Sequence, residues 1–342
     1  MSEPGFAVMD VGGTHLRTGI YQPGSGRLEA ARRVLTDGIA LHPGDPEMDL
    51  QQRVTEQIVT EAAKTLCLGD VMGLGVAFAG PVTATGSVLA APTIWGGDSR
   101  RLDLADLLRN RLGVPVTVVN DLTAAVWRYV RGPDEPPFCL LTISSGIGNK
   151  VYWGGRVLID DDGYGGELGH WACGADVAIV PCDCGGSGHL GAVASGRGVL
   201  AAARAAGLKD LPGYQESALG RSVFRPADLS NEVLAAAIRD HDVFGTDVLR
   251  ASLRPLAQAI MAVFFAIGVR RFRIIGGFAQ AIGSRYAQLL TEALQEIGGF
   301  GLTAADIDQL VTMGHADDDH SLIGAGRMLV RTGTGIPTGE VA

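Results

Sequence analysis

The sequence predicts an α/β protein made of two halves. Segments typical of buried strands alternate with segments whose apolar residues recur at helical spacing, and this alternation indicates an α/β architecture. The pattern strand, glycine-containing turn, strand occurs near the start of the chain and again after the Pro-rich segment 132–137. With 342 residues the chain is long enough for two domains, each with its own core.

The first half contains strands and helices in a regular order. Strands are expected at 6–10, 16–21, 28–36, 71–82 and 114–121, and helices at 49–67, 102–113 and 122–130. Gly113 is a suitable residue to end the second helix, because glycine readily adopts the left-handed conformation found there. The strand over 114–121 ends in two polar residues, Asn120 and Asp121.

The second half repeats the opening pattern and then becomes mostly helical. Two strands are expected within 138–160, on either side of a glycine turn, and helices at 232–239, 248–269 and 284–297 with a short strand at 272–277. The longest apolar run, 257–269, is too short to span a bilayer and predicts a buried helix.

Composition excludes several classes of partner. Lys and Arg total 28 against 37 Asp and Glu, so the formal net charge is −9, which argues against nucleic acid and anionic membrane surfaces as partners. The N-terminus lacks the basic and apolar regions of a signal peptide. The five cysteines are sparse and odd in number, unlike a secreted disulfide framework, so we expect a reducing cytoplasm.

The two glycine turns are candidate phosphate sites. The turns 10–14 (DVGGT) and 144–148 (SSGIG) can direct consecutive backbone N–H groups into one concavity, and glycine permits close approach of an anion. Either turn alone is more often an ordinary hairpin turn. Two of them, one in each half, indicate a nucleotide bound between domains, and the sequence has no P-loop motif.

Asn120 and Asp121 form a second candidate site. They lie where a buried strand meets a helix, at the carboxyl edge of the sheet where open α/β proteins bind ligands. Asp could instead cap the following helix. Capping explains only one of the two residues, so the pair favours a binding or catalytic site.

A third candidate site combines histidines and cysteines. Glu167 and His170 are three residues apart and would share a face if helical, and Cys182, Cys184 and His189 follow closely. Two thiolates and two imidazoles are the four ligands of a closed tetrahedral zinc site, and Cys173 could replace one of them. A redox pair is disfavoured because the Cys-x-x-Cys spacing is missing.

Five motifs together resemble ROK-family sugar kinases over essentially the whole chain. They are DVGGT, AGPV, PVTVVNDLTAA, GELGHW and CDCGGSGH, in the order and at the spacings of that family. The resemblance implies an actin-like ATPase (ribonuclease H-like) fold with two α/β domains around a cleft, and a homodimer. The smaller domain would comprise 1–121 plus a C-terminal helix near 321–334, and the larger 122–320 with the zinc motif.

The resemblance also implies roles for individual residues. Asp121 resembles the general base that takes the proton from the attacking hydroxyl, and Asn120, Glu167 and His170 resemble ligands of the sugar. His170, Cys182 and Cys184 match three zinc ligands, and His189 stands where a third cysteine is usual. The nucleotide residues would be Gly12, Gly13 and Thr14 in the first turn, Ser145 and Gly146 in the second, Gly276 and Gly277 on the adenosine side, and Asp10 near Mg²⁺.

The implied activity is ATP-dependent phosphorylation of a hydroxyl, expected to be an exocyclic CH2OH, with ATP, Mg²⁺ and structural Zn²⁺. Three positions depart from the family. Gly191 stands where a Glu usually contacts the sugar, His15 follows Thr14 where Lys is common, and the second turn reads SSGIGNK. The substrate could therefore be glucose, an amino sugar such as kanosamine, or a C7-cyclitol of the valiolone type.

Two other classes of function compete with the kinase. One is a catalytically silent sugar sensor of the same fold. The other is a transcriptional regulator, which we do not expect, because the first motif begins at Asp10, leaving no room for a helix-turn-helix, and the chain is acidic.

Overall fold

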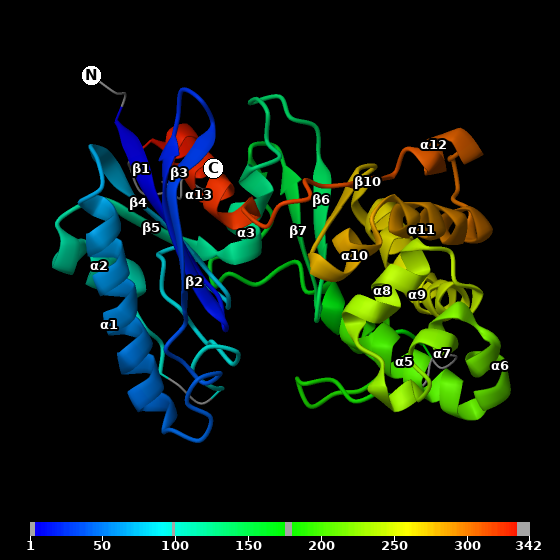
Figure 1. Ribbon diagram of the computed structural model, residues 1–342. Helices are drawn as coiled ribbons and strands as arrows, with labels where there is room; N and C mark the ends of the chain where they lie inside the picture. Colours follow the sequence, from blue (N-terminus) through cyan, green and yellow to red (C-terminus); the bar gives the residue numbers. More distant parts are fainter. Residues whose placement is uncertain (1–3, 98–99, 175–179, 334–342) are drawn as a thin grey trace. The chain divides into compact units, whose positions relative to one another are not determined.

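The computed structural model describes residues 4–97, 100–174 and 180–333. The chain divides into two compact units, each containing a five-stranded sheet (Figure 1). Unit 1 comprises Met1–Glu135, Val157–Gly165 and Asp319–Ala342, and unit 2 comprises Pro136–Arg156 and Gly166–Asp318. The first crossing between units thus lies in the Pro-rich segment rather than after residue 121.

Unit 1 is a mixed sheet between two layers of helices. Its elements are β1 (Gly5–Val11), β2 (His15–Gln22), β3 (Arg27–Leu35), α1 (Glu47–Leu66), β4 (Val71–Phe78), α2 (Leu104–Leu112), β5 (Val116–Asn120), α3 (Asp121–Trp127) and α13 (His320–Thr332). The strand order is β3-β2-β1-β4-β5, antiparallel from β3 to β1 and parallel from β1 to β5. The last residue of the helix expected near 321–334 lies outside the described residues.

β1 is buried on both faces because its side chains alternate between two cores. Ala7 and Met9 belong to the core that α1 and α2 cover, whereas Phe6 and Val8 belong to the core with α13. Figure 1 shows α1 and α13 on opposite sides of this sheet.

α3 stays with unit 1 because it packs closely against α13. A Cβ on Gly324 of α13 would lie 1.9 Å from Ala124 O of α3, so only glycine fits there. The segment Val157–Gly165 also joins unit 1, where Ala84 N donates to Asp161 O at 3.0 Å.

Unit 2 has a second sheet of order β10-β9-β6-β7-β8 and a large helical part. Its elements are β6 (Phe138–Ile143), β7 (Ile147–Trp153), β8 (Arg156–Val157), the 3-10 helix η1 (Leu168–His170), α4 (Leu190–Ala194), α5 (Gly196–Lys209), α6 (Leu211–Glu216), α7 (Ala218–Ser222), the 3-10 helix η2 (Pro226–Asp228), α8 (Asn231–Arg239), α9 (Val243–Ile267), β9 (Phe272–Ile275), α10 (Gly277–Ile282), α11 (Ser284–Ile297), α12 (Ala304–Asp308) and β10 (Val311–Met313).

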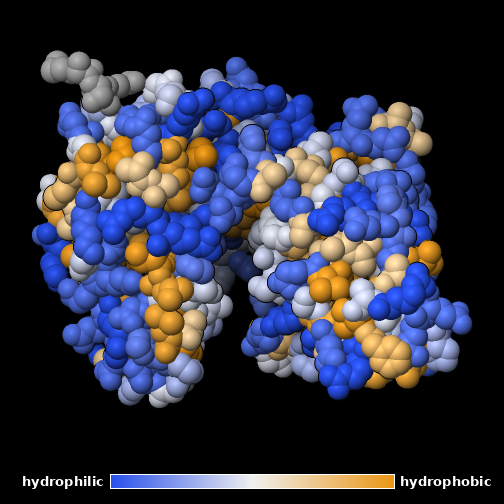
Figure 2. Space-filling view, viewed as in Figure 1, coloured by the Kyte–Doolittle hydropathy of each residue, from blue (hydrophilic) through white to orange (hydrophobic). Residues whose placement is uncertain are grey.

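The apolar run at 257–269 forms the end of α9, a helix of 25 residues that is longer than the run itself. Ile260 and Met261 are buried as expected, but Phe265 and Ile267 near the C-terminus of α9 are exposed. Among the described helices, α9 has the length and composition that could cross a membrane, and 50% of its most apolar stretch is buried. Core helices can share that length and composition, so this is weak evidence for a membrane span. The face seen in Figure 2 is mostly hydrophilic, with separate hydrophobic patches.

Candidate functional site

Asn120 and Asp121 stand at the junction of β5 and α3. Asn120, not Asp121, is the N-cap of α3: its Oδ1 accepts from Leu122 N and Thr123 N, both at 3.1 Å. Its Nδ2 donates to Gly80 O at 3.0 Å and to Asp121 Oδ1 at 2.9 Å. The capping role considered for Asp thus belongs to its neighbour.

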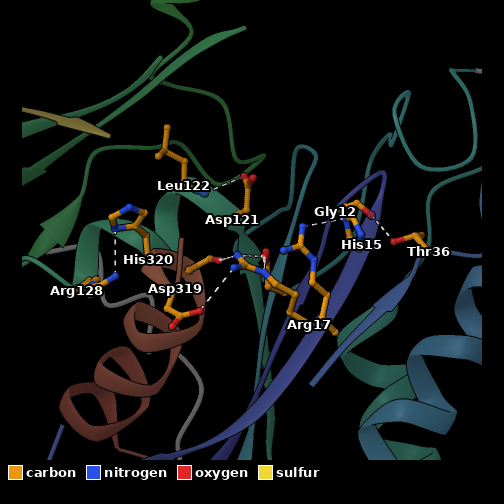
Figure 3. Close-up of polar contacts among 12 residues, drawn as sticks. Gly12, His15, Arg17, Thr36, Asp121, Leu122, Arg128, Asp319 and His320 are labelled. Atoms are coloured by element: carbon orange, nitrogen blue, oxygen red, sulfur yellow. Dashed lines mark hydrogen bonds and ion pairs between the residues drawn. The ribbon is translucent and has the colours of Figure 1, made fainter. Parts of the chain in front are cut away.

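These contacts use the full hydrogen-bonding capacity of Asn120, since an amide side chain has two donor hydrogens and two acceptor lone pairs. The same Oδ1 of Asp121 also accepts from Leu122 N at 2.8 Å (Figure 3). The Asp121 carboxylate is therefore oriented by the first turn of its own helix and by Asn120. A contact between Asn120 and substrate would exchange one of these bonds, and it stays a prediction.

The first glycine turn joins β1 to β2. Gly12 N donates to His15 O at 3.0 Å, and Thr36 Oγ1 donates to Gly12 O at 2.7 Å. A Cβ on Gly13 would lie 2.4 Å from Thr93 O, so close packing of the turn requires glycine there. Thr14 is exposed at the tip of the turn.

Asp10 lies at the end of β1 and pairs with Arg17, its partner in the β-ladder. Asp10 Oδ2 accepts from Arg17 Nε at 3.0 Å and Nη2 at 2.6 Å. Arg17 also lies 3.7 Å from a carboxylate oxygen of Asp319, just before α13 (Figure 3). Arg17 was not predicted from the sequence, although the alternation of two adjacent strands could have placed it on the same face as Asp10.

The second glycine turn lies in unit 2, between β6 and β7. Ser144 N donates to Gly146 O at 3.0 Å and closes the turn. Gly276 has φ +100°, and a Cβ there would lie 2.6 Å from the backbone of Ile143, so the two glycine segments meet. Ser144, Ser145 and Gly277 line one pocket of about 360 Å³. The structure thus brings Ser145 and the Gly276–Gly277 segment together, as their assignment to one nucleotide requires.

The expected metal ligands converge in unit 2. His170, Cys182, Cys184 and His189 each offer a donor atom, and these atoms all lie within 4.8 Å of one another. Cys182 Sγ is 3.7 Å from His170 Nδ1, and Cys184 Sγ is 3.2 Å from His189 Nδ1. Two sulfur and two nitrogen donors fit a closed tetrahedral zinc site.

Backbone contacts hold the cysteine loop in shape. Cys182 N donates to Gly186 O at 2.9 Å, and Ala172 pairs with His189 in an antiparallel bridge. Cys173 lies outside the donor cluster; it is buried, and its Sγ donates to Trp171 O at 3.8 Å. Burial also raises the pKa of the Cys173 thiol. Of the two candidates, His189 therefore completes the donor set.

Glu167 is the N-cap of the short helix η1, and His170 is its last residue. They do not share the face of an α-helix, since η1 is a single 3-10 turn. Lys150 Nζ lies 3.7 Å from Glu167 Oε1, and Leu168 N donates to Asn149 Oδ1 at 3.0 Å. Lys150 is another residue that the sequence analysis missed.

Gly191 faces this turn from α4. A Cβ at Gly191 would lie 3.1 Å from Gly169 O, which is tight enough to displace the neighbour by a few tenths of an ångström. The position where the family usually has Glu is therefore also a packing contact with the segment that carries Glu167 and His170.

Comparison with known proteins gives one consistent result. The profile of the ROK family matches residues 6–332. The C(7)-cyclitol 7-kinase of Streptomyces hygroscopicus subsp. jinggangensis is 47% identical over 327 residues, covering 94% of this chain and 93% of that protein. The 2-epi-5-epi-valiolone 7-kinase of an Actinoplanes species is 28% identical over 302 residues, covering 85% and 82%.

Solved structures agree on the fold. The ROK family glucokinase from Streptomyces griseus, in complex with glucose and AMPPNP, superposes with a TM-score of 0.72 at 23% identity, covering 95% of this chain and 98% of that one. This likeness confirms the expected α/β architecture, the actin-like ATPase fold.

Proposed function

The chain belongs to the ROK family, and we propose that it is an ATP-dependent kinase that phosphorylates a C7-cyclitol or a closely related hexose-like substrate. The observation that carries the proposal is the 47% identity to a C(7)-cyclitol 7-kinase over 94% of the chain. Within that class we assign the phosphorylated group to the exocyclic CH2OH, the 7-hydroxyl in a C7-cyclitol. The resemblance to a valiolone 7-kinase supports the same choice.

Asp121 is the proposed general base. Its carboxylate would take the proton of the substrate hydroxyl, whose oxygen forms the new bond to the γ-phosphorus while the bond from that phosphorus to ADP breaks. The support is the geometry of one carboxylate oxygen, which Asn120 Nδ2 and Leu122 N both contact. We propose that Asn120 positions this carboxylate and that it contacts the substrate by giving up one of its present hydrogen bonds.

The nucleotide would be held by both glycine turns. We assign the phosphates to Gly12, Gly13 and Thr14 of unit 1 and to Ser145 and Gly146 of unit 2, and the adenosine to the pocket beside Gly276 and Gly277. Mg²⁺ bound with ATP would neutralise charge developing on the phosphates. Asp10 would help to position that ion while it remains paired with Arg17.

Glu167 and His170 are the proposed substrate ligands of unit 2. His170 would bind the cyclitol and also zinc, together with Cys182, Cys184 and His189, so that the metal fixes the orientation of a substrate-binding ring. We place zinc in a structural role, because four protein donors leave no open position for catalysis.

Further elements of the proposal rest on the family and on composition. We propose a homodimer, as the family resemblance implies. We also propose a cytoplasmic location, in keeping with the free cysteines. We further propose two domains, as expected from the sequence, with residues 122–135 assigned to the first domain as they are in unit 1.

A substrate screen tests this function. ATP consumption is measured with C7-cyclitols, kanosamine, glucose and N-acetylmannosamine, and NMR assigns the position of the new phosphate. We expect the highest kcat/KM for a C7-cyclitol and phosphate on its exocyclic CH2OH. A preference for glucose would overturn the substrate assignment. Binding of cyclitol without turnover by any compound would instead indicate a silent sensor.

A further inference from the structure

The pocket beside the second glycine turn has distinct polar and apolar linings. Ser144, Ser145 and Gly277 line it from the two glycine segments, and Ala235, Phe278 and Ala281 provide apolar surface. All belong to unit 2. Its volume of about 360 Å³ is in the range of small-ligand pockets.

Asn231, the first residue of α8, contributes to this pocket a hydrogen-bond acceptor without a partner in the described part of the chain. Its Oδ1 is buried and has no hydrogen-bond partner among the described residues. Its neighbours on either side are engaged: Ser230 Oγ accepts from Val233 N at 3.4 Å, and a hydrogen bond with Ser230 lowers the pKa of Glu232. Buried acceptors nearly always have a partner, so an acceptor at a pocket wall indicates a donor on the ligand.

The orientation of α8 and α10 places this acceptor along the pocket. Asn231 and Ala235 are one turn apart on α8, as are Gly277 and Ala281 on α10. Arg239 Nη1, at the C-terminal end of α8, donates to Ala281 O at 3.1 Å near the end of α10. The contact between the C-terminal ends of the two adjacent helices places their N-termini at the same end, and Asn231 and Gly277 line the same pocket.

A nucleotide bound here as proposed above would have its phosphates toward the glycine turns and its base toward the apolar wall. The group between phosphate and base is the ribose, whose 2′ and 3′ hydroxyls are hydrogen-bond donors. We infer that Asn231 Oδ1 accepts a hydrogen bond from a ribose hydroxyl and selects ribonucleoside triphosphates over their deoxy analogues. This inference rests on the proposed use of ATP and adds a residue that reads the sugar of the nucleotide.

The test compares ATP, 2′-deoxy-ATP, 3′-deoxy-ATP and ITP as phosphoryl donors for the wild type, Asn231→Leu and Asn231→Asp. One hydrogen bond corresponds to roughly a tenfold change in KM. We expect the wild type to show about a tenfold higher KM for one of the two deoxy analogues. Asn231→Leu should raise the KM for ATP by about the same factor and abolish discrimination against that analogue. Asn231→Asp, which keeps an acceptor, should keep the discrimination.

Two controls make the result specific. Asn110→Leu is the same substitution at an exposed position of α2 and should leave every KM unchanged. The KM for the alcohol substrate should stay constant in all variants. Retention of discrimination in Asn231→Leu would overturn the inference, and so would loss of discrimination against ITP alone, which would assign Asn231 to the base.

Failure of the proposed function gives a different result. A wild type without turnover would contradict the kinase proposal, and the role of Asn231 is then measured by calorimetric binding of ATP and its deoxy analogues to the same variants. Equal affinity of the wild type for ATP and both deoxy analogues would overturn the inference whether or not the chain turns over.

Discussion

The junction of β5 and α3 and the cysteine loop of unit 2 are built on opposite principles. At the junction, Asn120 satisfies two backbone donors, a carbonyl and a carboxylate, so the chain itself holds Asp121 in place. In the cysteine loop, four donor atoms lie within 4.8 Å of one another, and two sulfur and two nitrogen donors are a set that suits zinc. The first region is held by hydrogen bonds within the chain, whereas the second would gain its rigidity from the proposed zinc.

The largest expected effect comes from removing the proposed base, Asp121, at the junction of β5 and α3. Asp121→Asn should lower kcat by about 10²- to 10⁴-fold, the range for loss of a general base, while thermal stability and cyclitol binding stay near wild type. Steady-state kinetics, thermal unfolding and calorimetry measure the three quantities. Asp106→Asn, in the exposed part of α2, is the matched control. Turnover near the wild-type rate would remove Asp121 as base.

The second effect concerns the metal-dependent region. Metal analysis should find about one zinc per chain, as a closed four-ligand site predicts. Chelation or Cys182→Ser should lower the melting temperature and raise the KM for cyclitol, because His170 loses its fixed orientation. A fully active, equally stable protein without metal would contradict the structural role of zinc.

Thiol labelling provides an independent measurement of the same site. Cys67 is exposed and should react with a maleimide in every state. Cys139 is buried, and burial raises the pKa of its thiol to about 12, so it should not react at neutral pH. Cys182 and Cys184 should become reactive only after chelation. Their labelling before chelation would show that they are not metal ligands.

The sequence predicts more of the cysteine loop than of the junction between β5 and α3. The sequence predicts His170, Cys182, Cys184 and His189 as zinc ligands from residue type and spacing, but it leaves Cys173 as an alternative that only the placement of the side chains separates. The division of roles between Asn120 and Asp121 does not follow from residue type, because either residue type can cap a helix and only the backbone geometry decides which one does. Asn231 was missed for the same reason, since nothing in sequence distinguishes a buried acceptor from an exposed one.

The fold shows a similar division. Strongly periodic elements such as α11 were predicted with their observed bounds, 284–297. The short helices α4 to α7, together with α10, α12 and β10, were not predicted. They are at most 6 residues long apart from α5, whose sequence GRGVLAAARAAGLK is rich in Ala and Gly and carries a weak apolar stripe. Tertiary packing rather than local pattern stabilises such elements.

A smaller effect should separate the two tasks of Asn120. Asn120→Asp keeps an N-cap acceptor but loses both donations of Nδ2, to Gly80 O and to Asp121 Oδ1. The cap acceptor is kept, and loss of the hydrogen bond that orients Asp121 should lower kcat about tenfold. Asn120→Ala loses both contacts and should also lose about 0.5–2 kcal/mol of stability. Thermal unfolding and kcat for each variant provide the comparison. Equal losses of stability in both variants would show that the cap cannot be separated from the orientation of Asp121.

The smallest expected effect is a change of substrate preference on substitution of Gly191. This residue lies against the segment that carries Glu167 and His170, the proposed substrate ligands of unit 2. Gly191→Glu should shift the ratio of kcat/KM toward ordinary aldohexoses, because the carboxylate offers hydrogen-bond acceptors to sugar hydroxyls. Gly191→Ala adds only a Cβ, 3.1 Å from Gly169 O, and measures the crowding of the segment that carries Glu167 and His170. A shift in Gly191→Glu that exceeds the shift in Gly191→Ala belongs to the carboxylate. Equal shifts would assign specificity to the packing of α4 on η1, and an unchanged ranking in both variants would show that Gly191 does not set specificity.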